Sequence, residues 1–354
     1  MDSQTIYNIG QLETQIEAPV HVGGAPGHHW FPMLHSLSDS EKLCMVTVSD
    51  DRVQGEWPGR IYHTNDGGSS WNDIGDMENV SHASVSINEQ RLLVLPYELF
   101  PANPNDFRNA CANGTMLDRP NHSRIVSSVE RVCFHGFSRD FTTHPGGQLK
   151  LATNGNVLTL ENGQLFTTLY GVYAPETRYT CVSAVSDDMG CNWNYRGTVA
   201  SWSQFPDASD GPCESNTVQL SDGRLLCIFR VGSGRNHPFG KCYSNDAGVS
   251  WTRAETIGPA WSVQPKLLLL ANGVLLLAGG RPGLFLWLCA DGSGLKWDPI
   301  NLAQHHNECC SNVSHHFTQE FCSADTGAPA QSTAYTGLMA TGPDEALLCY
   351  DRLG

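Results

Sequence analysis

The sequence predicts an all-β protein, and specifically a six-bladed β-propeller with four-stranded antiparallel blades. Two repeats support this prediction along the 354 residues: a hairpin that occurs six times, and a turn pattern of aspartate, glycine and tryptophan that occurs between hairpins. Composition agrees, because 35 glycines and 19 prolines favour many tight turns, and long amphipathic helical patterns are absent from the sequence. We expect residues 1–354 to form a single domain.

Each copy of the hairpin has an apolar strand, a short polar turn and a second strand rich in leucine. The turn centres recur every 50 to 73 residues, a spacing that fits one hairpin per blade. The six expected hairpins span residues 33–48, 85–95, 157–169, 218–229, 267–278 and 338–350.

Two segments, 101–127 and 301–329, lack both repeats, and we expect them to be long inserted loops. The second segment contains the pairs His305-His306, Cys309-Cys310 and His315-His316, with Cys322 nearby. These side chains have ligand-like chemistry but no recognised metal-binding spacing, so we expect a solvated loop and no metal.

The turn repeat has the pattern [ST]-x-D-x-G-x-x-W at residues 64–71, 186–193 and 244–251, and a fourth copy at 290–297 carries one extra residue before its tryptophan. We expect a β-turn in which the aspartate bonds nearby backbone, glycine supplies a positive φ, and tryptophan folds back on the hairpin. This pattern is the Asp box, or BNR repeat. The chain therefore resembles the sialidase-like (neuraminidase) six-bladed propellers over nearly its whole length, and we assign these aspartates no chemistry.

The net charge of −15 argues against nucleic acid or an anionic membrane surface as a partner. No apolar run is long enough to span a bilayer, and the first residues lack the features of a signal peptide. As written, the chain fits the cytoplasm, although thirteen cysteines and four glycosylation sequons would also fit a secreted protein whose leader was removed. The compartment, the disulfide pairing and the oligomeric state stay open, and no cofactor is expected.

The resemblance implies a catalytic pair. Glu214 precedes the fourth hairpin, where the family has a glutamate base, and Tyr335 precedes the last hairpin, where the family has its nucleophile. A tyrosine suits this reaction because an anionic nucleophile would be repelled by the carboxylate next to the anomeric carbon. Glu214 would need to lie within hydrogen-bonding reach of the Tyr335 hydroxyl to accept its proton.

The resemblance also implies a clamp for the substrate carboxylate, since a guanidinium can donate two parallel charge-assisted hydrogen bonds. Arg230 closes the fourth hairpin and Arg281 follows the fifth, both at positions of the family's arginine triad, and Arg52 stands where an accessory arginine occurs. Asp351 stands where the family often has a glutamate that steadies an arginine.

Two positions depart from the family. Trp30-Phe31-Pro32 occupies the place of an Arg-Ile-Pro segment, so the first arginine is missing and Trp30 is expected to wall the pocket, with His29 beside it. The acid/base aspartate has no clear match, and Glu56 or Asp51 are the candidates for this role.

These residues favour a retaining, sialidase-like exo-glycosidase that acts on a terminal acidic sugar, sialic acid or a related 2-keto acid. A polysaccharide lyase is the first alternative, with Tyr335 or His29 removing the proton beside a uronate carboxylate. A carbohydrate-binding propeller without activity is the second, favoured by Trp30 in place of arginine. The propeller hosts many activities, so fold alone does not choose among them.

Overall fold

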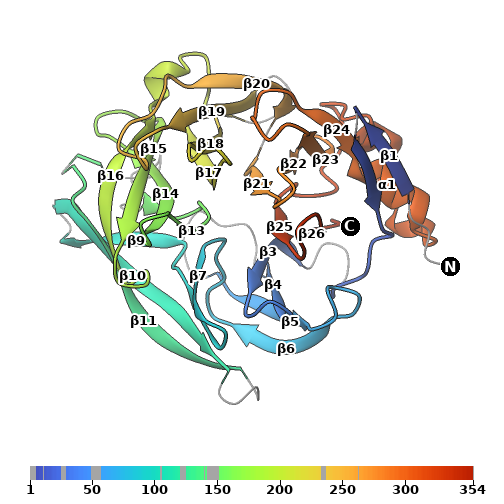
Figure 1. Cartoon of the computed structure of the whole chain (residues 1–354), viewed down its shortest axis with the longest axis horizontal. Helices are drawn as coiled ribbons and strands as arrows, with labels where there is room; N and C mark the ends of the chain where they lie inside the picture. Colours follow the sequence, from blue (N-terminus) through green and yellow to red (C-terminus); the bar gives the residue numbers. More distant parts are fainter. Residues whose placement is uncertain are drawn as a thin grey trace.

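The structure, a computed structural model, describes residues 5–10, 12–24, 29–48, 57–103, 106–119, 125–138, 140–141, 151–232, 237–261 and 263–353. The all-β prediction is confirmed, since strands form most of the regular structure. Figure 1 shows the sheets in a ring, with β3, β7, β17, β21 and β25 on the inner side and β6, β11 and β20 on the outer side.

Three sheets have four antiparallel strands each. The first contains β3 (Trp30–Ser36), β4 (Lys42–Thr47), β5 (Gly59–Thr64) and β6 (Asn72–Met77). The second contains β17 (Cys213–Gln219), β18 (Leu225–Arg230), β19 (Pro238–Ser244) and β20 (Glu255–Trp261). The third contains β21 (Lys266–Leu269), β22 (Leu275–Gly280), β23 (Leu284–Cys289) and β24 (Asp298–Asn301). Two hairpins stand as two-stranded sheets, β1 (Thr5–Ile9) with β2 (Leu12–Ile16) and β25 (Thr336–Ala340) with β26 (Ala346–Tyr350).

The remaining strands join one ten-stranded sheet, and this overturns the prediction of six separate four-stranded blades. Seven of its strands close on themselves, because β11 pairs with both β10 and β16 while β12 bridges β9 and β14. The β11–β16 pairing is parallel, a contact between distant segments that hairpin patterns do not encode. The strands are β7 (Ser84–Asn88), β8 (Arg91–Val94), β9 (Glu98–Asn103), β10 (Asp106–Asp118), β11 (Val126–His135), β12 (Leu151–Ala152), β13 (Leu158–Thr159), β14 (Leu165–Val172), β15 (Tyr179–Ser186) and β16 (Asn192–Ala200).

All six expected hairpins are confirmed as antiparallel pairs: β3–β4, β7–β8, β13–β14, β17–β18, β21–β22 and β25–β26. Their apolar side chains pack between neighbouring sheets. Leu226, Ile228, Leu275 and Leu277, for example, are all fully buried in one cluster that joins the second and third four-stranded sheets. The alternation that predicted the strands therefore also predicted part of the core.

The turn repeat has the expected geometry. In the first copy, Ser70 N–H donates to Asp66 Oδ1 at 3.0 Å, and the Trp71 indole donates to the Gly68 carbonyl at 3.0 Å. Copies 186–193 and 244–251 make equivalent bonds, and each has its glycine at positive φ. In the fourth copy, Cys289 Sγ accepts the glycine N–H that a hydroxyl accepts in the others. These aspartates serve the turns.

In the part of each segment that the structure describes, regular structure replaces the long loop that was expected. Residues 101–127 include all of β10, which pairs with β11, and a Cys111–Cys133 disulfide links these two strands. Residues 301–329 form helices α1 (Leu302–Cys309) and α2 (Gln319–Cys322) and the 3-10 turn η3 (Val313–His315); a further 3-10 turn, η2, is Trp202–Gln204.

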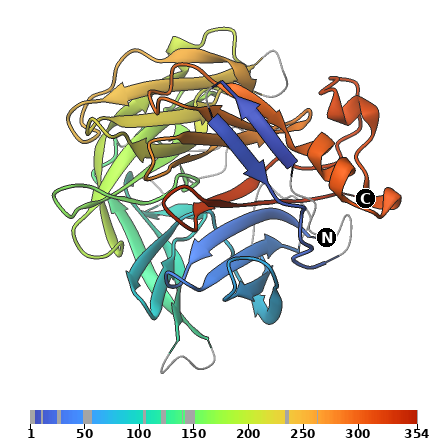
Figure 2. The ribbon, with the colours of Figure 1, turned by 45° about the vertical axis from the view of Figure 1, so that its right-hand side comes forward.

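The helical segment is packed, so the expectation of a solvated loop is wrong. His305 Nε2 lies 2.9 Å from the Glu17 carbonyl, and His306 Nδ1 lies 2.9 Å from the Tyr350 hydroxyl. Figure 2 shows the β1–β2 hairpin beside these helices. Neither α-helix in the described residues is long or apolar enough to cross a membrane.

Candidate functional site

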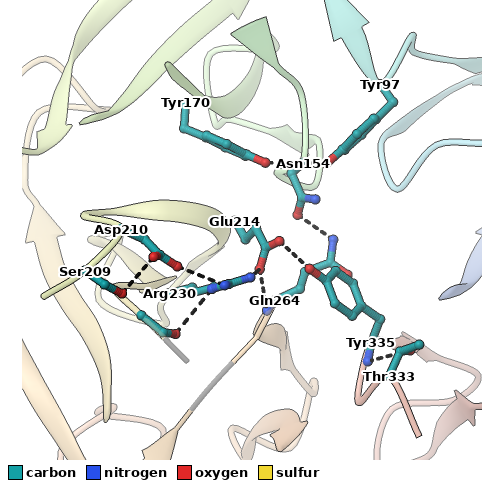
Figure 3. A network of polar contacts seen from close by, with 11 residues as sticks. Tyr97, Asn154, Tyr170, Ser209, Asp210, Glu214, Arg230, Gln264, Thr333 and Tyr335 are labelled. Carbon is teal, nitrogen blue, oxygen red and sulfur yellow. Dashed lines mark hydrogen bonds and ion pairs between the residues drawn. The ribbon is translucent and has the colours of Figure 1, made fainter. Parts of the chain in front are cut away.

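The β17–β18 hairpin and the turn before β25, which are far apart in sequence, meet at the centre of the ring (Figure 3). Glu214 lies on β17, Arg230 ends the neighbouring strand β18, and Tyr335 directly precedes β25. The Tyr335 hydroxyl donates a short hydrogen bond to Glu214 Oε1, and Arg230 Nη1 donates to Glu214 Oε2 at 3.1 Å. The structure thus brings together three of the residues singled out in the sequence.

Glu214 is aimed by a β-bulge. Cys213 pairs with Arg230 and Ser215 with Phe229, so Glu214 is an extra residue on its strand, and its φ is +35°. Bulges redirect side chains next to functional sites. This one turns Glu214 toward Tyr335 while leaving its side chain buried.

The Glu214 carboxylate is fully partnered. Burial raises its pKa, but the Arg230 guanidinium and hydrogen bonds from Tyr335 and the Gln264 backbone N–H outweigh burial, so the pKa lies below its usual value. Arg230 is held in turn by Asp210 at 2.9 Å. Glu214 is therefore an ionised acceptor in a buried environment.

The Tyr335 hydroxyl keeps its proton in this state. Burial and the charge of Glu214 raise the pKa of Tyr335 well above its usual value, while Arg230 and Arg281 act in the opposite direction. Its proton points to a carboxylate that can accept it, which is the geometry of a general base next to a hydroxyl nucleophile.

A further polar layer supports this cluster, and the sequence did not indicate it. Gln264 Nε2 donates to Asn154 Oδ1 at 2.5 Å, and the hydroxyls of Tyr97 and Tyr170 lie 3.4 Å apart beside Asn154 (Figure 3). These residues come from separate strands and loops, so no local spacing could have linked them.

A small pocket of about 70 Å³ opens over Tyr335. Its lining includes Phe31, Trp57, His82, Tyr97, Arg281 and Tyr335. The Arg281 guanidinium lies 5.7 Å from the Tyr335 ring centroid, and its buried Nε has no hydrogen-bond partner among the described residues. Arg281 thus offers a donor at the pocket that the protein does not use.

Phe31, rather than Trp30, forms the wall where the first arginine was missing. The Phe31 ring meets the Tyr335 ring edge to face at 4.8 Å, and Trp30 stacks on Phe31 at 5.7 Å. Trp30 is not part of the pocket lining, and His29 packs instead near Tyr62, at 6.2 Å between ring centroids.

Asp351 steadies backbone and not an arginine. Its carboxylate accepts from Phe31 N–H at 3.1 Å, Ser332 Oγ at 2.7 Å and Thr333 N–H at 2.8 Å, and it also bonds the Thr333 hydroxyl. Burial raises the pKa of Asp351, and these hydrogen bonds oppose that rise. Asp351 therefore ties the pocket wall to the turn that presents Tyr335.

Backbone strain concentrates around the pocket. Seven non-glycine residues among those described have positive φ, and four of them lie at this site: Phe31 (+52°), Glu214 (+35°), Arg281 (+77°) and Ala334 (+58°). Such conformations cost about 1–3 kcal/mol each and gather at active sites and ligand clamps. This distribution makes the cluster a candidate functional site independently of any resemblance.

Three candidate residues, Asp51, Arg52 and Glu56, lie outside the described residues. A separate cavity of about 670 Å³ lies between β20, β23 and the helices α1 and α2, and none of the candidate site residues lines it. Within the described part of the chain, no three His, Cys, Asp or Glu side chains are grouped as a metal site would require.

No protein family and no curated protein matches the sequence. Solved structures do match. A Dyadobacter fermentans protein of unknown function has a TM-score of 0.60 at 14% identity, over 94% of this chain and 93% of that one. The Hadza microbial sialidase Hz136 has a TM-score of 0.54 at 14% identity, over 92% of this chain and 63% of that one.

An α-L-arabinanase from Penicillium chrysogenum, complexed with arabinobiose, has a TM-score of 0.51 at 15% identity, over 77% of this chain and 81% of that one. The fold is therefore one that glycoside hydrolases use. Sialidases are among the proteins that share it, and this chain spans less than two thirds of the length of the sialidase Hz136.

Proposed function

We propose that this protein is a retaining glycoside hydrolase of the sialidase type, with Tyr335 as nucleophile and Glu214 as its base. The observation that carries the proposal is the Tyr335 O–H donated to a buried Glu214 carboxylate that Arg230 keeps ionised. Structural neighbours that are glycoside hydrolases support the reaction class but leave the substrate open.

The substrate is a terminal sugar with a carboxylate next to the anomeric carbon. Arg281 would bind that carboxylate, because its Nε is unpartnered and its guanidinium lies over Tyr335. Arg230 would contribute less to binding, since it already donates to Glu214, Asp210 and the Gly232 carbonyl. This differs from a clamp shared equally by the two arginines.

The described pocket is small, so only the carboxylate side of the sugar would enter it. Its volume of about 70 Å³ is below the range of roughly 300–1,000 Å³ that encloses a whole ligand of drug size. We expect the rest of the ring and the leaving group to lie at the pocket mouth.

In the first step, the Tyr335 oxygen attacks the anomeric carbon while its proton passes to Glu214, and the glycosidic bond breaks as the leaving oxygen takes a proton from an acid. Asp51 and Glu56 are the candidates for that acid. In the second step, water attacks the same carbon and gives a proton to the acid that was deprotonated in the first step. The bond from the carbon to the Tyr335 oxygen breaks and the sugar is released, while Glu214 returns its proton to that oxygen.

The test is release of fluorophore from 4-methylumbelliferyl glycosides of sialic acid, its deaminated analogue and uronic acids. We expect turnover of a 2-keto-acid glycoside and a fall in kcat of at least about 10³-fold in Tyr335→Phe, which removes the nucleophile but keeps the ring. Tyr243→Phe is the matched control, because the Tyr243 hydroxyl donates to Ser293 O, away from the pocket; its kcat should stay within about threefold.

The same preparations should be incubated with uronate polysaccharides while ultraviolet absorbance is followed. If the wild type forms new double bonds in the polysaccharide and Tyr335→Phe does not, the proposed hydrolase would be replaced by a polysaccharide lyase. If neither assay detects activity but the protein still binds acidic sugars, the proposed hydrolase would be replaced by a carbohydrate-binding protein without activity.

A further inference from the structure

Lys266 begins β21, and its side chain is buried against the polar centre of the ring, with 8% of the residue exposed. Its Nζ lies 3.5 Å from His82 Nδ1, the one hydrogen-bond contact of this amine among the described residues. A buried ammonium without a carboxylate partner is unusual, because desolvation of an unpaired charge is costly.

The neighbouring groups explain why Lys266 has no anionic partner. Glu214, on the adjacent strand β17, is the nearby carboxylate, but its oxygens already accept from Tyr335, Arg230 and the Gln264 N–H. On the other sides are two imidazoles, His82 and His35, which bring no negative charge. Burial lowers the pKa of Lys266 to about 7, and the charge of Glu214 opposes this shift.

His82 connects Lys266 to the pocket. It lines the pocket, and its ring lies 6.1 Å from the Tyr335 ring and 6.5 Å from the Tyr97 ring. Burial and the charge of Lys266 lower the pKa of His82 well below its usual value. His35 Nδ1 and Ser84 Oγ form a hydrogen bond of 2.7 Å, and burial lowers the pKa of His35 to about 4. Two positive charges 3.5 Å apart would also repel each other, so Lys266 and His82 together carry at most one positive charge near neutral pH.

We propose that Lys266 and His82 form a proton-accepting pair, and that it takes up one proton when a carboxylate-bearing sugar binds in the pocket beside Arg281. The inference rests on the acidic sugar of the proposed function. The bound carboxylate supplies the negative charge that the buried amine lacks, so it favours the protonated pair. The protonated pair provides a second cation in addition to Arg281, at a pocket whose wall residue Phe31 is uncharged.

The step is an acid–base equilibrium with no covalent change. The sugar enters as an anion, and one proton passes from the solvent buffer to the pair, so the pocket gains no net charge on binding. His82 contacts the ligand, and Lys266 is a positioning residue that acts through His82 and through its charge.

The experiment is titration calorimetry with N-acetylneuraminic acid as the probe, in two buffers of equal pH and different ionisation enthalpy. The difference in heat between the buffers gives the number of protons taken up. We expect roughly 0.5 to 1 proton per bound sugar at pH 8, close to none at pH 5.5, and an affinity that falls by up to about tenfold per pH unit above about pH 7.

Lys266→Met should abolish the uptake and weaken binding, while Lys266→Arg, whose cation does not titrate, should abolish uptake and retain binding. Lys42→Met is the matched control. Lys42 is also buried, but it bonds Ser36 and the carbonyls of residues 38 and 39 at the far end of the β3–β4 hairpin. Its variant should keep the uptake.

Binding without proton uptake, or unchanged uptake in Lys266→Met, would overturn this inference and leave the proposed function intact. Proton uptake on binding without turnover of any glycoside would support this inference and overturn the proposed function. Failure of both N-acetylneuraminic acid and glucuronic acid to bind would overturn the two together.

Discussion

Glu214 and Lys266 lie on the neighbouring inner strands β17 and β21, and both are more than nine-tenths buried, yet their surroundings differ. The carboxylate accepts from Tyr335, Arg230 and a backbone N–H, whereas the amine has one imidazole 3.5 Å away. The charge of Glu214 is thus stabilised before any ligand arrives, whereas the charge of Lys266 is left to be stabilised by a ligand. The first suits a permanent base and the second suits a group that responds to binding.

The largest expected effect comes from removing the permanent charge. Glu214→Gln keeps the shape of the side chain but cannot accept the Tyr335 proton as a carboxylate does, so kcat on the glycoside that the wild type cleaves should fall by about 10²–10⁴-fold. Asp222→Asn, in an exposed pair with Arg224, is the control and should keep wild-type kcat. A Glu214→Gln enzyme within about fivefold of wild type would remove Glu214 from the mechanism.

Breaking the partnered cluster from the other side tests its stability. Arg230→Met leaves Glu214 buried without its guanidinium, and the free energy of unfolding in urea should fall by about 3–5 kcal/mol. Arg224→Met removes a guanidinium from the exposed Asp222 pair, and here the loss should stay below about 1 kcal/mol. Equal losses in the two variants would show that the buried pair adds no more than a surface pair.

Removing the unpartnered amine should change stability with the opposite sign, and by an amount that depends on pH. The folded pKa of Lys266, about 7, lies below the ordinary value of about 10.4, so the unfolded chain binds the proton more readily between these limits. Wild-type stability should therefore rise with pH over this window, by at most about 1.4 kcal/mol per unit, and the penalty is complete below pH 7.

Lys266→Met lacks that penalty. The free energy of unfolding of Lys266→Met should exceed that of the wild type by the largest amount at pH 6. This excess should decline toward pH 9.5, as measured by urea denaturation across that range. A difference that does not change with pH would mean that Lys266 titrates normally in the folded protein.

The sequence predicted those features of the fold that depend on residues close together in the chain. Alternating apolar residues around a polar turn located the six expected hairpins, although not the β1–β2 hairpin. The spacing of Asp246, Gly248 and Trp251 predicted a turn whose bonds all lie within eight residues. The ten-stranded sheet was missed because its closure depends on β11 meeting β16 in parallel, 57 residues away at His135 and Asn192, with no signal in either strand alone.

The residues of the candidate site likewise include some that the sequence indicated and some that it did not. Resemblance indicated Glu214, Arg230 and Tyr335, and the structure joins them. It also indicated Trp30 as the wall, but a bulge between Trp30 and Met33 turns Phe31 to the pocket, and bulges have no reliable sequence signature. Lys266 was visible only as a lysine ahead of four leucines; its burial results from packing that brings β17 and β25 to either side.

The Asp351 carboxylate joins the first sheet to the last turn of the ring, and this has a consequence for the order of synthesis. Phe31, Glu214 and Tyr335 leave the ribosome in that sequence, and the bonds that hold the wall and the turn together require Asp351 itself. A nascent chain can fold its early hairpins but cannot assemble the pocket until residue 351 has emerged. The pocket is thus completed only at the end of translation, and a cut between Phe31 and Asp351 that separates the ring would take the pocket apart.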